Sequence, residues 1–227
     1  MTRYRLRLAA LVFGTALAPG ACIPYTVGTT AHTTPAGDAQ SFRTAYAIPN
    51  GLRAPDDSVS VAVVGFDYEL RRGLDDRSDI GVRFPSFSGA VINYKRRITD
   101  DATFSAPATA FMVGGGVVNW LEHAHLEATV IRSGARHGEF TFYGGARVMQ
   151  TIPLSRFAVS DTPTAGGFFG VMFGDDNSGF TPEIGIYYDR SALGLRSSTI
   201  IVVPSITLRG GGFGRVFRLL QLAPPGR

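Results

Sequence analysis

The residues best suited to chemistry are His123, His125 and Glu127, which alternate along the segment LEHAHLEATVI. In an extended strand, positions i, i+2 and i+4 face the same side. Two imidazoles and a carboxylate on one side can bind a metal ion if a neighbouring strand supplies further ligands. The same residues also suit a polar face without a metal. We expect the polar face, with no metal site and no cofactor.

Other catalytic arrangements find less support in the sequence. A lipid hydrolase needs Ser, His and an acid in register across strands, and no serine stands at a recognisable spacing from His123 or His125. Asp75-Asp76 and Asp175-Asp176 lack the alternating ligands of an EF-hand. The glycine triplets at 114–116 and 210–212 are not followed by Lys-Ser/Thr, so they predict turns rather than phosphate loops. We predict no catalytic residue and a protein that is not an enzyme.

Charge and cysteine content narrow the possible partners. The formal net charge is +4, but Arg3, Arg5 and Arg7 lie at the very start, so the remaining chain is nearly neutral. The other arginines form no run longer than a pair, which argues against a nucleic-acid partner. The sole cysteine, Cys22, excludes an internal disulfide framework.

Residues 1–21 have the layout of a secretory signal peptide. The basic stretch MTRYRLR precedes the apolar residues 8–18 and the sequence Pro19-Gly20-Ala21-Cys22. An apolar helix of this length rises about 16 Å, well short of the roughly 30 Å hydrocarbon layer. We therefore predict cleavage and export.

Two interpretations of Cys22 remain open. The segment resembles the signal of bacterial lipoproteins, which implies that Cys22 becomes an acylated N-terminus. Ordinary cleavage at the small residues Ala18 and Gly20 would instead leave Cys22 near a free N-terminus. We favour lipid attachment at Cys22, followed by a flexible tether over residues 22–36.

From residue 37 onward the chain alternates with period two. In VSVAVVGFDYEL, Ala62, Val64 and Phe66 share one side, while Asp67 and Glu69 share the other. Turn residues such as RRGLDDR at 71–77 and PSFS at 85–88 separate the alternating segments. With weaker candidates at 41–48, 104–113 and 167–173, we count about ten strands, within a range of about eight to twelve. The pattern predicts an all-β fold, a single antiparallel up-and-down β-barrel over residues 37–227.

The polar side of these strands carries both signs of charge. We expect its members to form a network in the lumen, where opposite charges neutralise one another. The predicted network comprises Asp67, Glu69, Asp79, Arg83, Lys95, Arg97, His123, His125, Glu127, Arg147, Glu183 and Asp189. On the apolar side, aromatic residues near the strand ends fit an interfacial girdle, namely Tyr68, Phe84, Tyr94, Phe140 and Tyr188.

Several alternating runs extend over about 10 to 14 residues, longer than the five or six typical of globular domains and long enough to span a membrane. The leader, with YELRRGLDDRSDIGVRF leading into GAVINYKRRI, resembles small bacterial outer-membrane β-barrel proteins over most of residues 37–222. This resemblance implies an outer-membrane location, outer-membrane lipid as the partner, and a structural or permeability-related role.

Two other functions stay open. One is a lipid-anchored periplasmic soluble barrel that binds a small apolar ligand, and the third is a barrel-embedded lipid-modifying enzyme. The direction of Phe66, Ile92, Phe142 and Ile186 separates the first two interpretations, because a soluble barrel buries its apolar face and a membrane barrel presents it to lipid. The sequence predicts that these side chains point outward.

Overall fold

Ten antiparallel strands follow one another along the chain. The computed structural model describes residues 23–53, 60–100, 106–156, 162–175, 178–189 and 200–210. The strands are β1 (Ala39–Arg53), β2 (Ser60–Asp75), β3 (Ser78–Pro85), β4 (Ala90–Arg97), β5 (Ala108–Val118), β6 (His123–Ser133), β7 (Phe140–Pro153), β8 (Thr164–Gly174), β9 (Ser178–Tyr188) and β10 (Ile200–Gly210). The part of the chain that the structure describes contains no apolar helix of membrane-spanning length.

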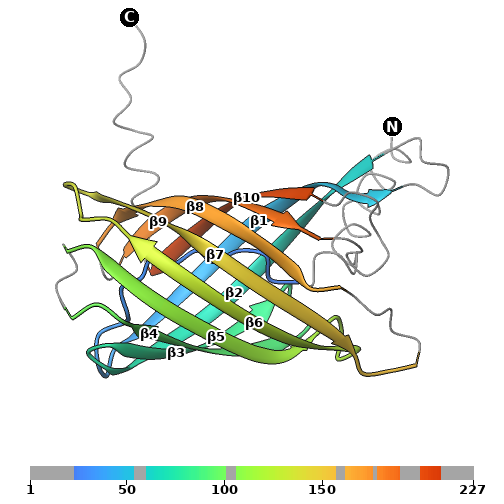
Figure 1. The fold of residues 1–227 in the computed structure, drawn as a ribbon, viewed down its shortest axis with the longest axis horizontal. Coiled ribbons are helices and arrows are strands. Elements are labelled where there is room, and N and C mark those ends of the chain that lie inside the picture. The colour runs from blue at the N-terminus through green and yellow to red at the C-terminus, as the bar shows by residue number, and fades with distance from the viewer. Residues whose placement is uncertain are drawn as a thin grey trace, which may run out of the picture.

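Each strand pairs with the next, and β10 pairs with β1, so the sheet closes into a barrel (Figure 1). The predicted up-and-down barrel of about ten strands is therefore confirmed. We call the end where β1 begins and β10 finishes the first end, and the end holding the β3–β4 and β5–β6 hairpins the second end. In Figure 1 the first end lies on the left.

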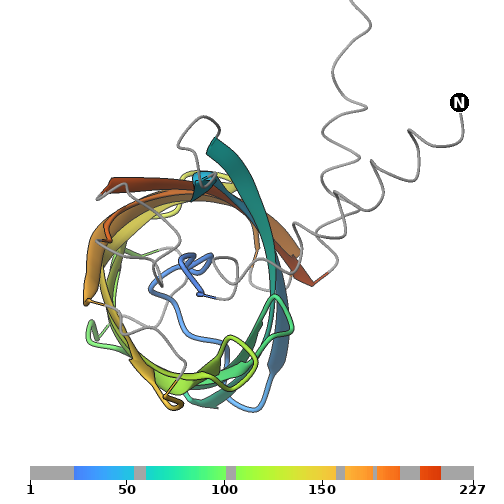
Figure 2. The same ribbon diagram turned by 90° about the vertical axis from the view of Figure 1, so that its right-hand side faces the viewer.

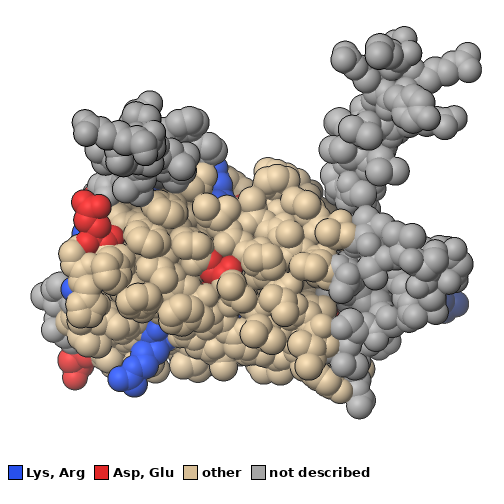
Figure 3. All heavy atoms as spheres, turned by 90° about the horizontal axis from the view of Figure 1, so that it is seen from above, with Lys and Arg blue, Asp and Glu red and all other residues tan. Residues whose placement is uncertain are grey.

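The barrel wall points its apolar side chains outward. Phe66 is 59% exposed, Ile92 55%, Phe142 45% and Ile186 54%. The alternate residues of the same strands are buried, as the period of two requires. On the face seen in Figure 3, residues other than Lys, Arg, Asp and Glu cover most of the described surface. The predicted orientation of the apolar side is confirmed.

The glycine triplet at 114–116 does not form the turn that the sequence predicted. It lies inside β5, where Gly114 pairs with Asn93 of β4 and Glu127 of β6. A Cβ on Gly114 would lie 2.9 Å from the Cγ of Glu127 and 3.0 Å from the Cβ of Asn93. Glycine is needed here because these two side chains occupy the adjacent lumen.

The segment before β1 is also placed differently from the prediction. Residues 23–36, which we call the lumen segment, run through the inside of the barrel, as the blue chain within the ring of strands in Figure 2 shows. The segment begins near the second end, where Ile23 belongs to the same buried apolar cluster as Ile48 and Ile201, and reaches the first end where Ala36 bridges Gly73.

The expected flexible tether over 22–36 is therefore corrected for residues 23–36, most of which are buried. The sequence of this segment has no alternating pattern, so its burial depends on groups supplied by distant strands. The predicted signal peptide and Cys22 lie outside the described residues.

Candidate functional site: a charged lumen closed by residues 23–36

The structure places all twelve residues of the predicted network inside the barrel. Each is at most 5% exposed. Eleven of them lie on β2, β3, β4, β6, β7 and β9, and Asp189 directly follows β9. Alternation along the strands explains this placement, because each residue occupies the side opposite the exposed apolar residues. The lumen is therefore the region where chemistry-bearing side chains gather.

One part of the network centres on Arg71. Its guanidinium forms ion pairs with Glu69 and with Asp79, where Nε lies 3.1 Å from Oδ1. Arg83 also binds Glu69, with Nε at 3.0 Å and Nη2 at 2.8 Å from Oε2. The Nζ of Lys95 lies 3.5 Å from Asp79. Removing one partner of a buried ion pair leaves an uncompensated charge, at a cost of about 3–5 kcal/mol. Because Glu69 and Asp79 each bind two bases, loss of either carboxylate would leave two buried cations without this partner.

A second part of the network surrounds Glu127. Arg147 forms an ion pair with this carboxylate, and the Nε2 of His125 lies 3.1 Å from its Oε2. The Nδ1 of His123 instead lies 3.3 Å from the side-chain nitrogen of Asn119. His125 and Glu127 thus act within an ion-pair cluster, while His123 faces a turn. Among the described residues, no group of three His, Cys, Asp or Glu side chains is placed to hold a metal.

Sequence reasoning missed two charged members of the network among the described residues, Arg71 and Arg209. The twelve predicted residues contain six acids but only four bases besides the histidines, and these two arginines bring the buried bases of the described wall to six. Arg71 continues the polar side two positions after Glu69, but the predicted turn at 71–77 hid it, because β2 extends to Asp75. The guanidinium of Arg209 lies 5.0 Å from the ring centre of Phe42. An excess of acids in the predicted lumen was the signal that bases were missing.

Carboxylates of the wall bind backbone N–H groups of the lumen segment. Val27 and Gly28 donate to the two oxygens of Glu183, at 2.9 and 2.8 Å. Thr34 donates to Asp79 at 2.8 Å. A charged acceptor makes such hydrogen bonds roughly twice as strong as neutral ones. The acids therefore supply the backbone partners that a neighbouring strand would otherwise provide.

Basic residues of the wall bind carbonyl groups of the same segment. Arg83 and Arg147 both donate to the carbonyl oxygen of Thr26, at 2.7 and 2.6 Å. Lys95 donates to the carbonyl of His32 at 2.6 Å. Each of these bases also contacts an acid of the network, so the segment and the wall share one set of charges.

The apolar side chains of the lumen segment pack against apolar patches of the inner wall. Ile23 and Tyr25 join a buried cluster that includes Tyr187 near the second end, and Val27 and Ala31 join a second cluster. The hydroxyl of Tyr187 donates to the carbonyl of Tyr25. These contacts remove apolar surface of the segment and of the inner wall from contact with water, which is favourable.

Near the first end, the lumen segment borders a small cavity. A cavity of about 10 Å³ borders Thr29, His32, Lys95 and Arg209 near the first end, which is room for about one water molecule. Packing of the segment and the charged side chains therefore fills the lumen around this point.

No protein-family model and no curated protein matches the sequence. Among solved structures, the chain is similar to an outer-membrane channel from Pseudomonas putida F1, with a TM-score of 0.49, 8% identity, and coverage of 82% of this chain and 99% of that one. It is also similar to Neisserial surface protein A (TM-score 0.36, 15% identity, 76% and 95% coverage). A third similar structure is the outer membrane protein OprG from Pseudomonas aeruginosa (TM-score 0.34, 9% identity, 80% and 99% coverage). All three of these structures have TM-scores below 0.5 and identities of 15% or less.

Proposed function

We propose that this chain is a bacterial outer-membrane β-barrel protein with a structural role, whose lumen is closed by its own residues 23–36. The observation that carries this proposal is the inverted burial of the wall: large apolar side chains are exposed, and six acids and six bases are buried. Fully burying a Phe, Ile or Leu side chain stabilises a protein by about 1.5–3 kcal/mol. A wall that exposes so many of them suits hydrocarbon rather than water.

The backbone of the barrel also suits a bilayer. A closed sheet pairs its backbone groups internally, which hydrocarbon requires. Five of the strands, β5, β6, β8, β9 and β10, are 11 residues long, and a tilted membrane strand needs about 9–11. A barrel with an even number of antiparallel strands is the form found in bacterial outer membranes.

Aromatic turns extend the apolar band where the wall is short. Strands β3 and β4 have only eight residues each, and the turn between them exposes Phe87, while the neighbouring turn exposes Trp120. Both residues have positive φ angles, 56° and 57°, which costs roughly 1–2 kcal/mol per residue. Placing these rings at a membrane interface offsets that cost, because aromatic side chains favour the interface.

Trp120 provides a direct test, because it is the only tryptophan in the chain. In vesicles containing brominated lipids, we expect quenching of Trp120 to be strongest when the bromine lies near the headgroups. A matched control moves the tryptophan into the lumen, as Trp120→Phe combined with Tyr143→Trp, and should not be quenched. Trp120 that stays accessible to aqueous iodide and unquenched by lipid would contradict a membrane-embedded wall and favour the tethered soluble barrel.

The finer part of the proposal is export and lipid attachment at Cys22. The lumen segment begins at Ile23 near the second end, so an acylated Cys22 would join the bilayer at that end, opposite the start of β1. Mass spectrometry of the N-terminal peptide should find a diacylglyceryl group, and Cys22→Ser should lack it. We expect Cys22→Ser to remain in the membrane fraction through its barrel, and a free cysteine at the N-terminus would contradict acylation.

A further inference from the structure

The outer wall has a hollow over β1. It measures about 430 Å³ and is lined by Ala45 of β1, Phe66 and Tyr68 of β2, Phe87 of the β3–β4 turn, and Ile206 and Leu208 of β10. Its volume lies within the range of about 300–1,000 Å³ typical of small-molecule sites. The hollow is therefore large enough for a bound molecule.

The register of the strands explains the hollow. Ala45 pairs with Phe66 on one side and with Ile206 on the other. A methyl group thus lies between two large side chains, which form walls on either side of β1. The two side walls of the hollow are therefore set by the pairing of these strands, and Phe87 of the β3–β4 turn completes the lining.

The hollow also has a charged border. Arg43 lies one row nearer the first end, between Tyr68 and Leu208, and lines the hollow. Its side chain is exposed on the outer face, and the described residues offer it no hydrogen-bond or ion-pair partner. On a membrane-facing strand, an arginine is costly unless its long side chain reaches the headgroup region. An unpaired cation beside an apolar hollow matches a ligand with an anionic head and an apolar tail.

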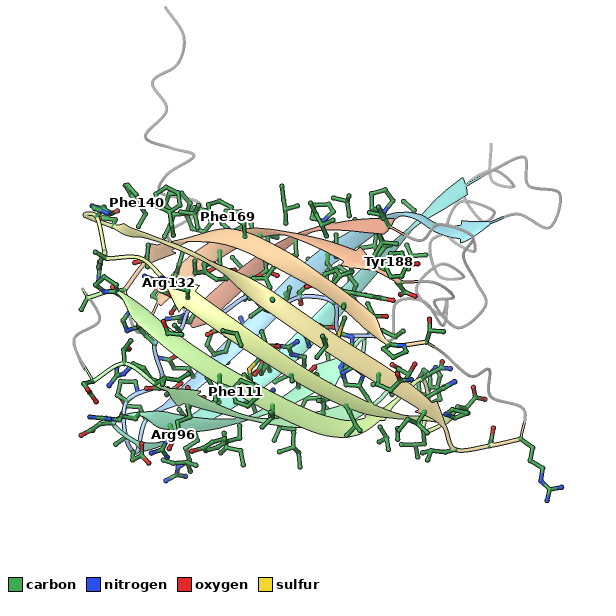
Figure 4. All side chains as sticks on the ribbon, in the orientation of Figure 1. Arg96, Phe111, Arg132, Phe140, Phe169 and Tyr188 are labelled. Atoms are coloured by element: carbon green, nitrogen blue, oxygen red, sulfur yellow. The ribbon has the colours of Figure 1, made fainter. Side chains whose placement is uncertain are left out.

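A second hollow gives a useful contrast. It is lined by Arg96 and Arg77 together with Phe111 on the β4–β5 side of the barrel, and Figure 4 shows Arg96 near the first end, where Arg132 also lies. There Arg96 donates to the hydroxyl of Tyr94 at 3.4 Å, and Arg77 pairs with Asp100 at 2.9 Å. Protein groups already engage both cations, so Arg43 is the better candidate for an external anion.

We propose that the hollow over β1 binds one acyl chain of a phospholipid, and that Arg43 holds the phosphate of the same molecule. This inference rests on the proposed membrane location. Apolar side chains of β2 and β10 accept the hydrocarbon, while the guanidinium presents several N–H donors in the geometry that suits phosphate.

The test uses the full chain in vesicles containing a phospholipid with a photoreactive acyl chain, followed by mass spectrometry of the labelled peptides. We expect labelling to concentrate on β1, β2 and β10. Arg43→Gln should reduce it about tenfold, as expected for loss of a charged hydrogen bond. Ala45→Phe fills the hollow, so labelling should no longer concentrate on β1, β2 and β10.

Matched controls separate this site from ordinary lipid contact. Arg132→Gln removes another outward arginine near the first end, and Ala128→Phe enlarges an outward alanine that pairs with Val113 and Val148. Neither should change labelling of β1. Even labelling around the wall, or equal labelling by a diacylglycerol probe without phosphate, would overturn the inference. Quenching of Trp120 is measured on the same vesicles. If lipid quenches Trp120 but labelling is even, the proposed lipid site is wrong. If lipid does not quench Trp120, the proposed membrane location is wrong.

Discussion

The lumen segment and β1 are consecutive in the sequence, yet they are held in different ways. The backbone of β1 pairs with β2 at twelve registered positions and with β10 at five. The backbone of residues 23–36 is held by side chains instead, among them Glu183, Asp79 and Lys95. A wall strand therefore needs only the right alternation of side chains, whereas the lumen segment needs particular ionisable groups from strands distant in the sequence.

The difference also separates two kinds of stability. The pairs of β1 belong to a closed sheet and can only be lost by opening the barrel. The contacts of the lumen segment lie within a finished wall, so the segment can be removed or loosened while the wall persists. Three changes test this comparison, beginning with the largest.

The largest change is deletion of residues 24–35, which removes most of the lumen segment and leaves the charged side chains of the wall. We expect the full chain to give no stepwise ion conductance in planar bilayers and the deletion variant to conduct, because the lumen segment fills the space between the charged walls. Heat-shifted migration in gels checks that the deleted chain still folds. A folded deletion variant that does not conduct would show that the wall's own side chains close the lumen.

The second change compares two adjacent arginines of β2. Arg71 is 1% exposed and pairs with Glu69 and Asp79, whereas Arg72 faces outward. Arg71→Met leaves two buried carboxylates without this partner, and we expect a loss of about 3–5 kcal/mol in unfolding free energy. Arg72→Met should change it by no more than about 0.5 kcal/mol. Urea unfolding in lipid vesicles measures both, and equal losses would contradict the assigned difference between inner and outer faces.

The smallest change removes one wall carboxylate that holds the lumen segment and also accepts a hydrogen bond from Tyr143. Glu183→Gln removes the charge that accepts hydrogen bonds from Val27 and Gly28. A charged hydrogen bond contributes about 1.5–3 kcal/mol, so the amide hydrogens of Val27 and Gly28 should exchange about 10 to 100 times faster. Exchange along β1 should not change. Glu139→Gln, at an exposed turn residue, is the control, and unchanged exchange at Val27 in Glu183→Gln would show that packing alone holds the segment.

Most of the wall could be predicted because one period governs it. The alternation around Phe66 and Asp67 fixes which side chains share a face, and the same rule recurs in the other strands. The prediction failed where the period was masked by local composition. The glycines at 114–116 predicted a turn although β5 continues through them, and the arginines at 71 and 72 were assigned to a turn although β2 extends to Asp75.

The sequence predicted which charged residues face the lumen, but it did not predict which of them form ion pairs with one another. The sequence placed Glu69, Arg83 and Glu127 on the inward side, yet nothing in their spacing joins Glu69 to Arg83 or Glu127 to Arg147. Such pairs form between strands whose register depends on the whole closed sheet. Arg71 was missed for a different and local reason, because its segment was predicted to be a turn although β2 extends to Asp75.

The sequence alone determined the two-faced character of the strands, since side-chain direction in a strand follows from position parity and needs no neighbour. Tertiary structure decided the fate of residues 23–36, because their backbone partners come from β2 to β9 and are brought together only when the barrel closes. The same holds for the hollow over β1, which exists because closure sets Ala45 between Phe66 and Ile206. Local pattern fixes which way a side chain points, while closure of the sheet fixes what it meets.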